Sequence, residues 1–190
     1  MAAFGKTSFS KLKTCDIRIV KVCNVAIKTF DFAVLCGARG ANDQMVGFRN
    51  GKSNLVYPLG RHNPKLDKKD LMRLSEILQC GTDITEGIKH ADVQTLKLID
   101  DEAKYYKSRA VDIVPYLPNK PHVDWRYFKE LRVAINAGNH KEGKEIEKNI
   151  GRWHELAGRV LGVAESMGIK LAWGGHWKNF VDLPHFELAE

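Results

Sequence analysis

The chain has 190 residues, of which 44% are hydrophobic and 28% charged, a composition that suits one folded domain and excludes a disordered, collagen-like or coiled-coil protein. Its formal net charge of +7 indicates an anionic partner, such as a cell-wall polymer, a membrane surface or a nucleic acid. Because the lysines are scattered and no helix-turn-helix or zinc-finger spacing occurs, we expect no nucleic-acid partner.

The first third of the chain predicts a helix, a strand and a second helix. Apolar residues recur at three- and four-residue steps over residues 10–29, the spacing of one amphipathic helix. The aromatic and branched stretch FDFAVLCGA, residues 30–38, predicts a buried strand that ends in a turn. Residues 41–53 predict a short helix that stops at an Asn-Gly pair, followed by a loop that two prolines interrupt.

The middle of the chain predicts a small helical lobe, residues 63–107. Asp67 is placed to cap a helix over residues 68–79. A second helical pattern covers residues 90–106, with its apolar positions on one side.

The last part of the chain predicts two strands separated by helices. RAVDIVPYL, residues 109–117, alternates apolar residues around Asp112 and reads as a strand. Helices are expected to begin near Asp124 and to span residues 142–167, before a strand over residues 169–175. This order predicts an α+β fold for residues 1–190: a small antiparallel sheet with helices packed on it, plus the inserted helical lobe.

The cysteines and the N-terminal segment indicate where the protein is made. No CxxC pair occurs, so the four cysteines are expected to be buried free thiols rather than disulfides or ligands of a cysteine-metal site; they are Cys15, Cys23, Cys36 and Cys80. The first residues lack the apolar stretch of a secretory signal, and no run approaches 18 apolar residues. We therefore expect synthesis in the cytoplasm, no signal peptide and no membrane span.

The segment WGGHWKNFVDLPHFEL, residues 173–188, contains candidate residues for a hydrolytic metal site. Zinc hydrolysis needs three protein ligands, an open position for water and a base near that water. Asp182 stands three residues before His185, so the pair can provide one base and one ligand. A histidine among aromatic residues is also typical of a hydrogen-bonded structural role, and the pair alone does not decide between the two.

The aromatic residues of this segment have two interpretations as well. Trp173, Trp177 and Phe180 can line a groove for a peptide or a sugar, or they can wedge the final loop against the sheet. His176 can contact substrate or lie on the surface. We take Trp173, His176 and Trp177 as candidate substrate-binding residues.

Together with SRAVDIVPY, residues 108–116, this segment resembles the M15-type zinc peptidases, which include D-Ala-D-Ala carboxypeptidases and phage L-alanyl-D-glutamate endolysins. In that family a Ser-x-His-x-x-Gly-x-Ala-x-Asp motif gives zinc a histidine and an aspartate. A later histidine completes the site, and the acidic residue three positions before it is the base. The resemblance implies that Asp112 and His185 are zinc ligands and Asp182 is the catalytic base.

The N-terminal half supports the same resemblance. FAVLCGARGANDQ, residues 32–44, is similar to the family's strand, Gly-x-Arg turn and following glutamine. This likeness implies a catalytic role for Arg39, whose planar guanidinium suits an oxyanion or a substrate carboxylate, and a substrate-binding role for Gln44.

One departure concerns the first histidine of the motif. The position seven residues before Asp112 holds Tyr105, and Ser108 stands where the glycine belongs. A second alignment matches NGKSNLVYPLGRH, residues 50–62, to the family's Gly-Lys-Ser segment and makes His62 the first ligand. Residues 63–107 are then an insertion inside the metal motif. Replacement of the ligand by Tyr105 or His90, or a broken site, are the alternatives.

The resemblance implies a phage-type endolysin that uses Zn²⁺ to cut the stem peptide of peptidoglycan between L-Ala and D-Glu. Its expected partners are that stem peptide and the anionic cell-wall surface. It would act at the wall as a monomer after release through a separate hole-forming protein. Two alternatives stay open: a D-Ala-D-Ala carboxypeptidase, and a non-catalytic wall-binding or virion structural protein.

Overall fold

A computed structural model describes the whole chain except residues 1, 64–65, 104–106, 120–121 and 190. The helices in the described part are α1 (Lys6–Leu12), α2 (Ile17–Ala26), α3 (Ala41–Arg49), α4 (Lys68–Leu78), α5 (Ile84–His90), α6 (Val93–Ala103), α7 (Phe128–Asn136), α8 (His140–Ser166) and the short 3-10 helix η1 (Gly174–His176). The strands are β1 (Phe32–Cys36), β2 (Ala110–Pro115), β3 (Leu171–Trp173) and β4 (His185–Leu188).

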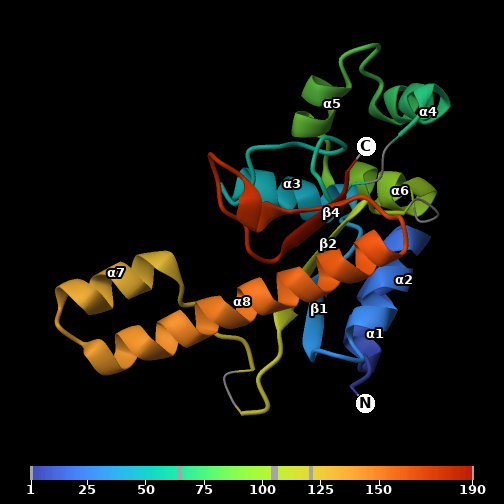
Figure 1. The fold of residues 1–190 in the computed structure, drawn as a ribbon. Coiled ribbons are helices and arrows are strands. Elements are labelled where there is room, and N and C mark those ends of the chain that lie inside the picture. Colours follow the sequence, from blue (N-terminus) through green and yellow to red (C-terminus); the bar gives the residue numbers. More distant parts are fainter. Residues whose placement is uncertain (1, 64–65, 104–106, 120–121, 190) are drawn as a thin grey trace.

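The strands form one four-stranded sheet in the order β1-β2-β4-β3, and every neighbouring pair is antiparallel. The expected α+β fold with a small antiparallel sheet is confirmed. Figure 1 shows the long α8 passing across the sheet, with α1 and α2 beside it.

One face of the sheet packs against α2 and α8. Val34, Ile113 and Phe186 are fully buried there and join a hydrophobic cluster with Trp153 and Val160 of α8. Since side chains alternate between the faces of a strand, the residues next to Ile113 and Phe186 point to the opposite face. Those residues include Asp112 and His185.

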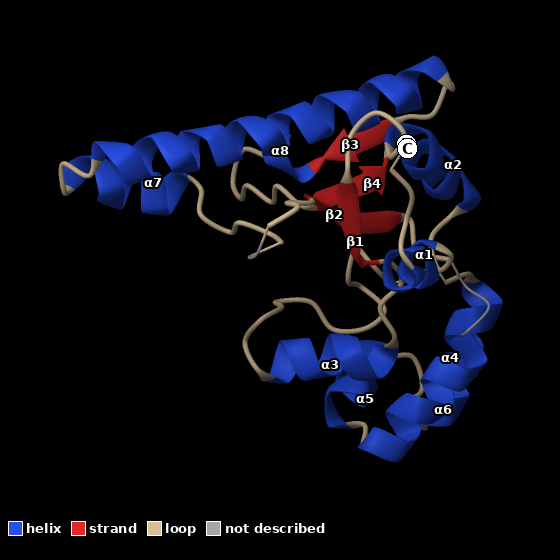
Figure 2. Cartoon of the chain, turned by 90° about the horizontal axis from the view of Figure 1, so that it is seen from below, coloured by secondary structure: helices blue, strands red, loops and turns tan. Residues whose placement is uncertain are grey.

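A second hydrophobic cluster lies apart from the sheet. It joins α3 with α4, α5 and α6 through buried residues that include Met45, Tyr57, Leu74, Ile88 and Leu96. In Figure 2 the sheet lies between α8 and this group of helices. The expected helices of residues 63–107 are present within the described residues, and α4 begins with the Asp67 cap, whose side chain accepts from the Asp70 amide.

The structure corrects three element predictions. The single helix expected over residues 10–29 is two helices, because the Asp16 side chain accepts from the Arg18 amide and starts α2 anew. The helix expected near Asp124 begins at Phe128, since Asp124 instead accepts from the Arg126 amide at 2.9 Å. Helix α5 and strand β4 were not predicted. None of the helices in the described part is both long and apolar enough to cross a membrane.

Candidate metal centre

The structure brings together three of the predicted site residues from distant parts of the chain. Asp112 lies in β2 and His185 begins β4, where the two residues are direct partners across the strands. His62 comes from the turn segment between α3 and α4. Its Nε2 lies 2.9 Å from Asp112 Oδ1 and 3.2 Å from His185 Nδ1, and His185 Nδ1 lies 3.2 Å from Asp112 Oδ1.

These three donor atoms fit a divalent cation. Zinc bonds of about 2.0–2.1 Å in a tetrahedron place neighbouring ligand atoms about 3.3 Å apart, close to the separations found here. Each ring also has an acceptor for its other nitrogen: His62 Nδ1 donates to the Gly37 carbonyl at 2.9 Å, and His185 Nε2 lies 3.3 Å from Glu187 Oε2. Such partners fix the tautomer and leave the inward nitrogens free to bind a metal.

Glu187 is itself held in place by Arg61. The two side chains form an ion pair, and the guanidinium lies 4.3 Å from the ring centre of Trp177. The Trp177 ring in turn lies 5.0 Å from that of His185. The hydrogen bond to His185 and the charge of Arg61 lower the pKa of Glu187 to about 2. Glu187 is therefore a firmly anionic acceptor behind the ring, and Trp177 packs against a candidate ligand.

Without a metal the donors form an ionic cluster. Burial disfavours the charged form of His62 and of Asp112. The hydrogen bond and the charge of Asp112 nevertheless raise the pKa of His62 to about 10. The hydrogen bonds from His185 and His62 outweigh burial at Asp112 and keep its pKa well below the usual range. A proton on His62 thus takes the place that a metal cation would occupy beside Asp112.

Asp182 shares the cavity with these donors. A cavity of about 530 Å³ is lined by residues that include His62, Asp112, Asp182 and His185. Burial, followed by the charge of Asp112, raises the pKa of Asp182 above its ordinary value. A carboxylate with a raised pKa is a better proton acceptor for catalysis near neutral pH than an ordinary aspartate.

Gly174 permits the tight turn that holds Asp182. A Cβ atom at position 174 would lie 2.5 Å from the Asp182 carbonyl oxygen and 3.2 Å from the Cβ of His185. Only glycine therefore allows this close approach without movement of the backbone.

Arg39 and Gln44 both line the cavity and are bonded to each other. Arg39 Nη1 donates to Gln44 Oε1 at 3.2 Å. Gln44 Nε2 donates to the Leu55 carbonyl and to Ser53 Oγ, and the residue is only 1% exposed. The oxygen and the nitrogen of the Gln44 side chain thus already have partners within the protein. These contacts position Arg39 and residues 53–55.

The aromatic candidates lie beside the centre rather than in its cavity. Trp173 is 2% exposed, and its indole nitrogen donates to the Leu183 carbonyl at 2.7 Å, which favours the packing role. His176 is exposed and packs edge-on against Trp173. Among the described residues, the aromatic side chain that lines the cavity is the exposed Phe180.

Of the alternatives for the first ligand, the structure describes His90, which is not brought to the centre. His90 is in α5 with its side chain 84% exposed, where it faces Glu86. Tyr105 lies outside the described residues. Among the candidates that the structure describes, His62 is the one that meets Asp112.

Cys36 is one of the residues near the centre that sequence reasoning missed. The four cysteines are free, as expected, but only Cys15 and Cys23 are buried, whereas Cys36 and Cys80 are partly exposed. The Cys36 sulfur and donor atoms of His62 and Asp112 all lie within 4.8 Å of one another. Nothing in the sequence distinguishes Cys36 from an ordinary cysteine inside a strand. Glu187 and Arg61 were missed too, because their roles depend on contacts between distant parts of the chain.

Comparison with known proteins bears on this arrangement. A family model described as D-alanyl-D-alanine carboxypeptidase, of the M15 peptidase type, matches residues 102–188. The resemblance to M15-type peptidases is confirmed. The M15-type match includes Asp112, Asp182 and His185 and begins after His62, so the place of His62 depends on the geometry above.

A solved structure and the curated proteins complete the comparison. The L-Ala D-Glu endopeptidase ChiX of Serratia marcescens shares the fold, with a TM-score of 0.55 and 20% identity over 98% of this chain and 89% of that one. No curated protein sequence matches the chain.

Proposed function

We propose that the protein is a zinc-dependent peptidoglycan peptidase of the phage endolysin type, which hydrolyses the stem peptide between L-Ala and D-Glu. The observation that carries the proposal is the convergence of His62 Nε2, Asp112 Oδ1 and His185 Nδ1 at 2.9 to 3.2 Å. The M15-type match and the fold shared with an L-Ala D-Glu endopeptidase support the substrate class.

In this proposal His62, Asp112 and His185 hold the zinc ion. When bound, the ion supplies Lewis acidity and lowers the pKa of water from 15.7 to about 7. Asp182 accepts the proton of the attacking water and passes it to the leaving amine, as suits its raised pKa. Arg39 steadies the negative charge that develops on the scissile carbonyl oxygen.

The charge of the cavity suits an acidic substrate. Arg39, Lys52 and Arg61 all line it. The stem peptide carries carboxylates, and the formal charge of +7 attracts the protein to an anionic wall surface. The protein would act there as a monomer after its release from the cytoplasm of the host.

The helical lobe has a place in this proposal as an insertion into a single domain of residues 1–190. His62 precedes residues 63–107 and Asp112 follows them, so the chain leaves the metal centre, forms α4 to α6 and returns through β2. A metal site depends on where the donor atoms lie and not on the length of chain between them, so a lobe whose ends lie close together leaves the site intact.

A second candidate is a D-Ala-D-Ala carboxypeptidase, which the description of the matching family favours. Such an enzyme must bind the free carboxylate at the end of its substrate, and Arg39 is a cationic side chain in the cavity suited to that task. The two candidates share the same metal chemistry and differ in the bond that is cut.

Metal analysis and digestion of peptidoglycan test the proposal together. Purified protein should hold about one zinc per chain, and His62→Ala and His185→Ala should each lose it. Asp182→Ala should keep the zinc and lose wall-lysing activity. Mass analysis of the fragments should show new L-Ala carboxyl and D-Glu amino ends. Release of free D-Ala alone would identify the carboxypeptidase, and a zinc-loaded protein that releases nothing would overturn both.

A further inference from the structure

The segment that carries Arg39 is joined to the segment that carries His62 by three hydrogen bonds. His62 Nδ1 donates to the Gly37 carbonyl at 2.9 Å, and the Arg39 amide donates to the His62 carbonyl at 3.1 Å. The side chain of Asn63 makes the third bond, from Nδ2 to the Arg39 carbonyl at 2.7 Å. Two consecutive residues, the first of which is a proposed zinc ligand, therefore hold Arg39 by its amide and by its carbonyl.

Asn63 makes this contact from a buried position. The residue is 5% exposed, and its own amide donates to the Gly60 carbonyl at 2.9 Å, which closes a turn over residues 60–63. Its Oδ1 is buried and has no hydrogen-bond partner among the described residues. In the described part of the chain, the bond to Arg39 is thus the polar contact of the Asn63 side chain.

Glycine at position 60 leaves room for this arrangement. A Cβ atom there would collide with Asn63 Oδ1 and would lie 2.7 Å from Gln44 Oε1. Gln44 Oε1 is the oxygen that accepts from the Arg39 guanidinium. Gly60 therefore adjoins two side chains that contact Arg39, one at its backbone and one at its guanidinium.

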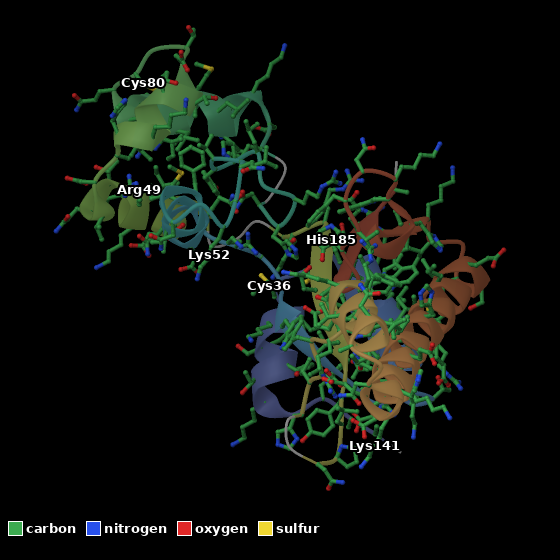
Figure 3. The ribbon with its side chains drawn as sticks, turned by 90° about the vertical axis from the view of Figure 1, so that its left-hand side faces the viewer. Cys36, Arg49, Lys52, Cys80, Lys141 and His185 are labelled. Carbon is green, nitrogen blue, oxygen red and sulfur yellow. The ribbon has the colours of Figure 1, made fainter. Side chains whose placement is uncertain are left out.

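Thr14 holds the same segment from another side. The Ala38 amide donates to Thr14 Oγ1 at 2.7 Å, so the neighbouring amides of Ala38 and Arg39 have partners in different parts of the chain. Figure 3 shows Cys36, the last residue of β1, between the sheet and the helical lobe, and residues 37–39 continue from that point. A movement of the His62 segment thus changes the hydrogen bond of the Arg39 amide and leaves that of the Ala38 amide in place.

We propose that Asn63 is a positioning residue that couples His62 to Arg39, so that a metal bound by His62 also fixes Arg39 in the cavity. This inference rests on the proposed function, since it needs a metal at His62 and an arginine that acts on the substrate. Coordination through His62 Nε2 restricts the motion of residues 62–63. The two hydrogen bonds to the Arg39 backbone transmit this restriction, and the guanidinium then keeps its place in the cavity.

Asn63→Leu removes the donor and keeps most of the side-chain volume. The variant should hold zinc about as tightly as the wild type, because the three ligands are unchanged. On a synthetic stem peptide that contains the L-Ala–D-Glu bond, its kcat should fall about 10- to 100-fold with KM nearly unchanged, since a displaced guanidinium no longer meets the charge of the transition state. A kcat equal to that of the wild type would overturn the role of Asn63.

A double-mutant cycle tests whether Asn63 acts through Arg39. In the Arg39→Ala background, Asn63→Leu should lower kcat by less than about twofold, because the group that Asn63 positions is already absent. A loss as large as that in the wild-type background would mean that Asn63 acts on another group, and it would overturn the proposal.

Asn149 in α8 provides the matched control. It is 6% exposed, and its Nδ2 donates to the carbonyls of Asp124 and Arg126, so it also holds a backbone segment through a buried amide. None of these three residues lines the cavity. Asn149→Leu should therefore leave kcat unchanged. An equal loss of kcat in both variants would show that kcat reports only a general loosening of the fold, which would remove the role of Asn63.

Hydrogen exchange gives a readout that does not depend on activity. The exchange of the Arg39 and Ala38 amides is followed by nuclear magnetic resonance in the wild type with and without zinc. Zinc should slow the Arg39 amide at least about threefold more than the Ala38 amide, because the first is bonded to His62 and the second to Thr14. In Asn63→Leu this difference should shrink to less than about twofold. Equal slowing of both amides in the wild type would refute the coupling.

Gly60→Ala covers the case in which Asn63→Leu fails to fold. The new Cβ displaces the side-chain oxygens of Asn63 and Gln44 and leaves every polar group present, so kcat should fall and the difference between the two amides should shrink. Gly47→Ala in α3, where the nearest atom to the new Cβ is the Ser53 Cβ at 3.9 Å, should change neither. Unchanged kcat and exchange in Gly60→Ala would count against the proposal and overturn it.

The outcomes separate this inference from the proposed function. A wild-type protein that binds zinc and cuts the peptide, but in which zinc slows both amides equally, would overturn the coupling and leave the proposed function standing. A wild-type protein that binds zinc and cuts no peptide would overturn the proposed function, while a larger effect of zinc at Arg39 than at Ala38 would still support the coupling.

Discussion

At the scale of single residues, the candidate centre depends on which nitrogen of each histidine faces inward. His62 presents Nε2 and His185 presents Nδ1, and each ring directs its other nitrogen toward an oxygen, the Gly37 carbonyl in one case and Glu187 in the other. Because a carbonyl oxygen can only accept, His62 Nδ1 must carry a proton. The neutral ring is therefore in the one tautomer that can bind a metal toward Asp112.

The raised pKa of His62 gives the first prediction, the release of protons on metal binding. A folded pKa of about 10, above the ordinary 6.5, means that metal-free His62 is protonated at pH 7 and that its stabilising contribution is lost as pH rises through about 10. Zinc must displace this proton, so affinity should rise with pH up to about 10. Calorimetry at pH 7 in buffers of different ionisation enthalpy should show at least one proton released per zinc; none would contradict a protonated His62.

Gly174 gives the second prediction. In Gly174→Ala the new Cβ would lie 2.5 Å from the Asp182 carbonyl oxygen, so the backbone of residues 182–185 must move. We expect a loss of about 1–3 kcal/mol in the free energy of unfolding and weaker zinc binding through His185. Denaturant unfolding and a competitive chelator measure the two effects.

Gly158 in α8 is the matched control for this change. A Cβ there meets no atom within 4 Å and the glycine has no positive φ, so Gly158→Ala should be neutral or stabilising by up to about 1 kcal/mol. Equal destabilisation by both substitutions would show that close approach is not the reason for glycine at position 174.

At the scale of elements, one contact connects the helical lobe to the segment that carries Arg39. Asp100 in α6 accepts hydrogen bonds from the backbone amides of Ala41 and Asn42, the first residues of α3. Gly40 makes room for this carboxylate, since a Cβ there would lie 2.6 Å from an Asp100 oxygen. The start of α3 is thus capped from another helix rather than by its own N-cap residue, Gly40.

The third prediction is that Asp100→Ala loosens α3 and lowers activity. Loss of a cap costs about 1 kcal/mol in the free energy of unfolding. It also leaves the amides of Ala41 and Asn42, which follow closely after Arg39, without their partner. Hydrogen exchange should become faster at the start of α3, and peptidase activity should fall with zinc content unchanged. Asp83→Ala removes a comparable cap from α5, where Asp83 accepts from the Glu86 amide, and should leave activity unaltered.

The elements also show what sequence can and cannot predict. The long periodic pattern of α8 and the alternation around Asp112 identify elements, because each pattern reports which face is buried. Asp182 and His185 are close in sequence, so their closeness in space follows from a local turn. Cys36 joins them only because β1 has an extra residue, and alternation cannot reveal an irregularity that shifts one strand against its neighbour. The role of Glu187 could not be predicted either, because its ion-pair partner Arg61 comes from a turn that is distant in the sequence.

At the scale of the whole molecule, the ligands of the candidate centre come from segments that belong to two different hydrophobic clusters. Asp112 and His185 come from the sheet, whose other face belongs to the main cluster. His62 follows Val56 and Tyr57, which belong to the cluster of α3 to α6. A metal bound by all three residues therefore ties the sheet to the segment that enters the helical lobe.

The fourth prediction is that zinc stabilises the whole fold. A ligand that binds only the folded state adds about 2.7 kcal/mol at a concentration of 100 times its Kd. For a chain of this length such a gain corresponds to a rise of roughly 5–10 °C in Tm. Because the ligands join both clusters, tryptophan fluorescence, which reports the main cluster through Trp153, and circular dichroism, which reports the helices, should shift together.

His62→Ala is the control for this stabilisation, since it removes the ligand whose segment belongs to the cluster of α3 to α6. The variant should melt at the same temperature with and without zinc, while Asp182→Ala, which leaves the three ligands in place, should gain as much as the wild type. A zinc-dependent shift in fluorescence without slower hydrogen exchange in α4 to α6 would mean that the metal stabilises the sheet without coupling it to the helical lobe.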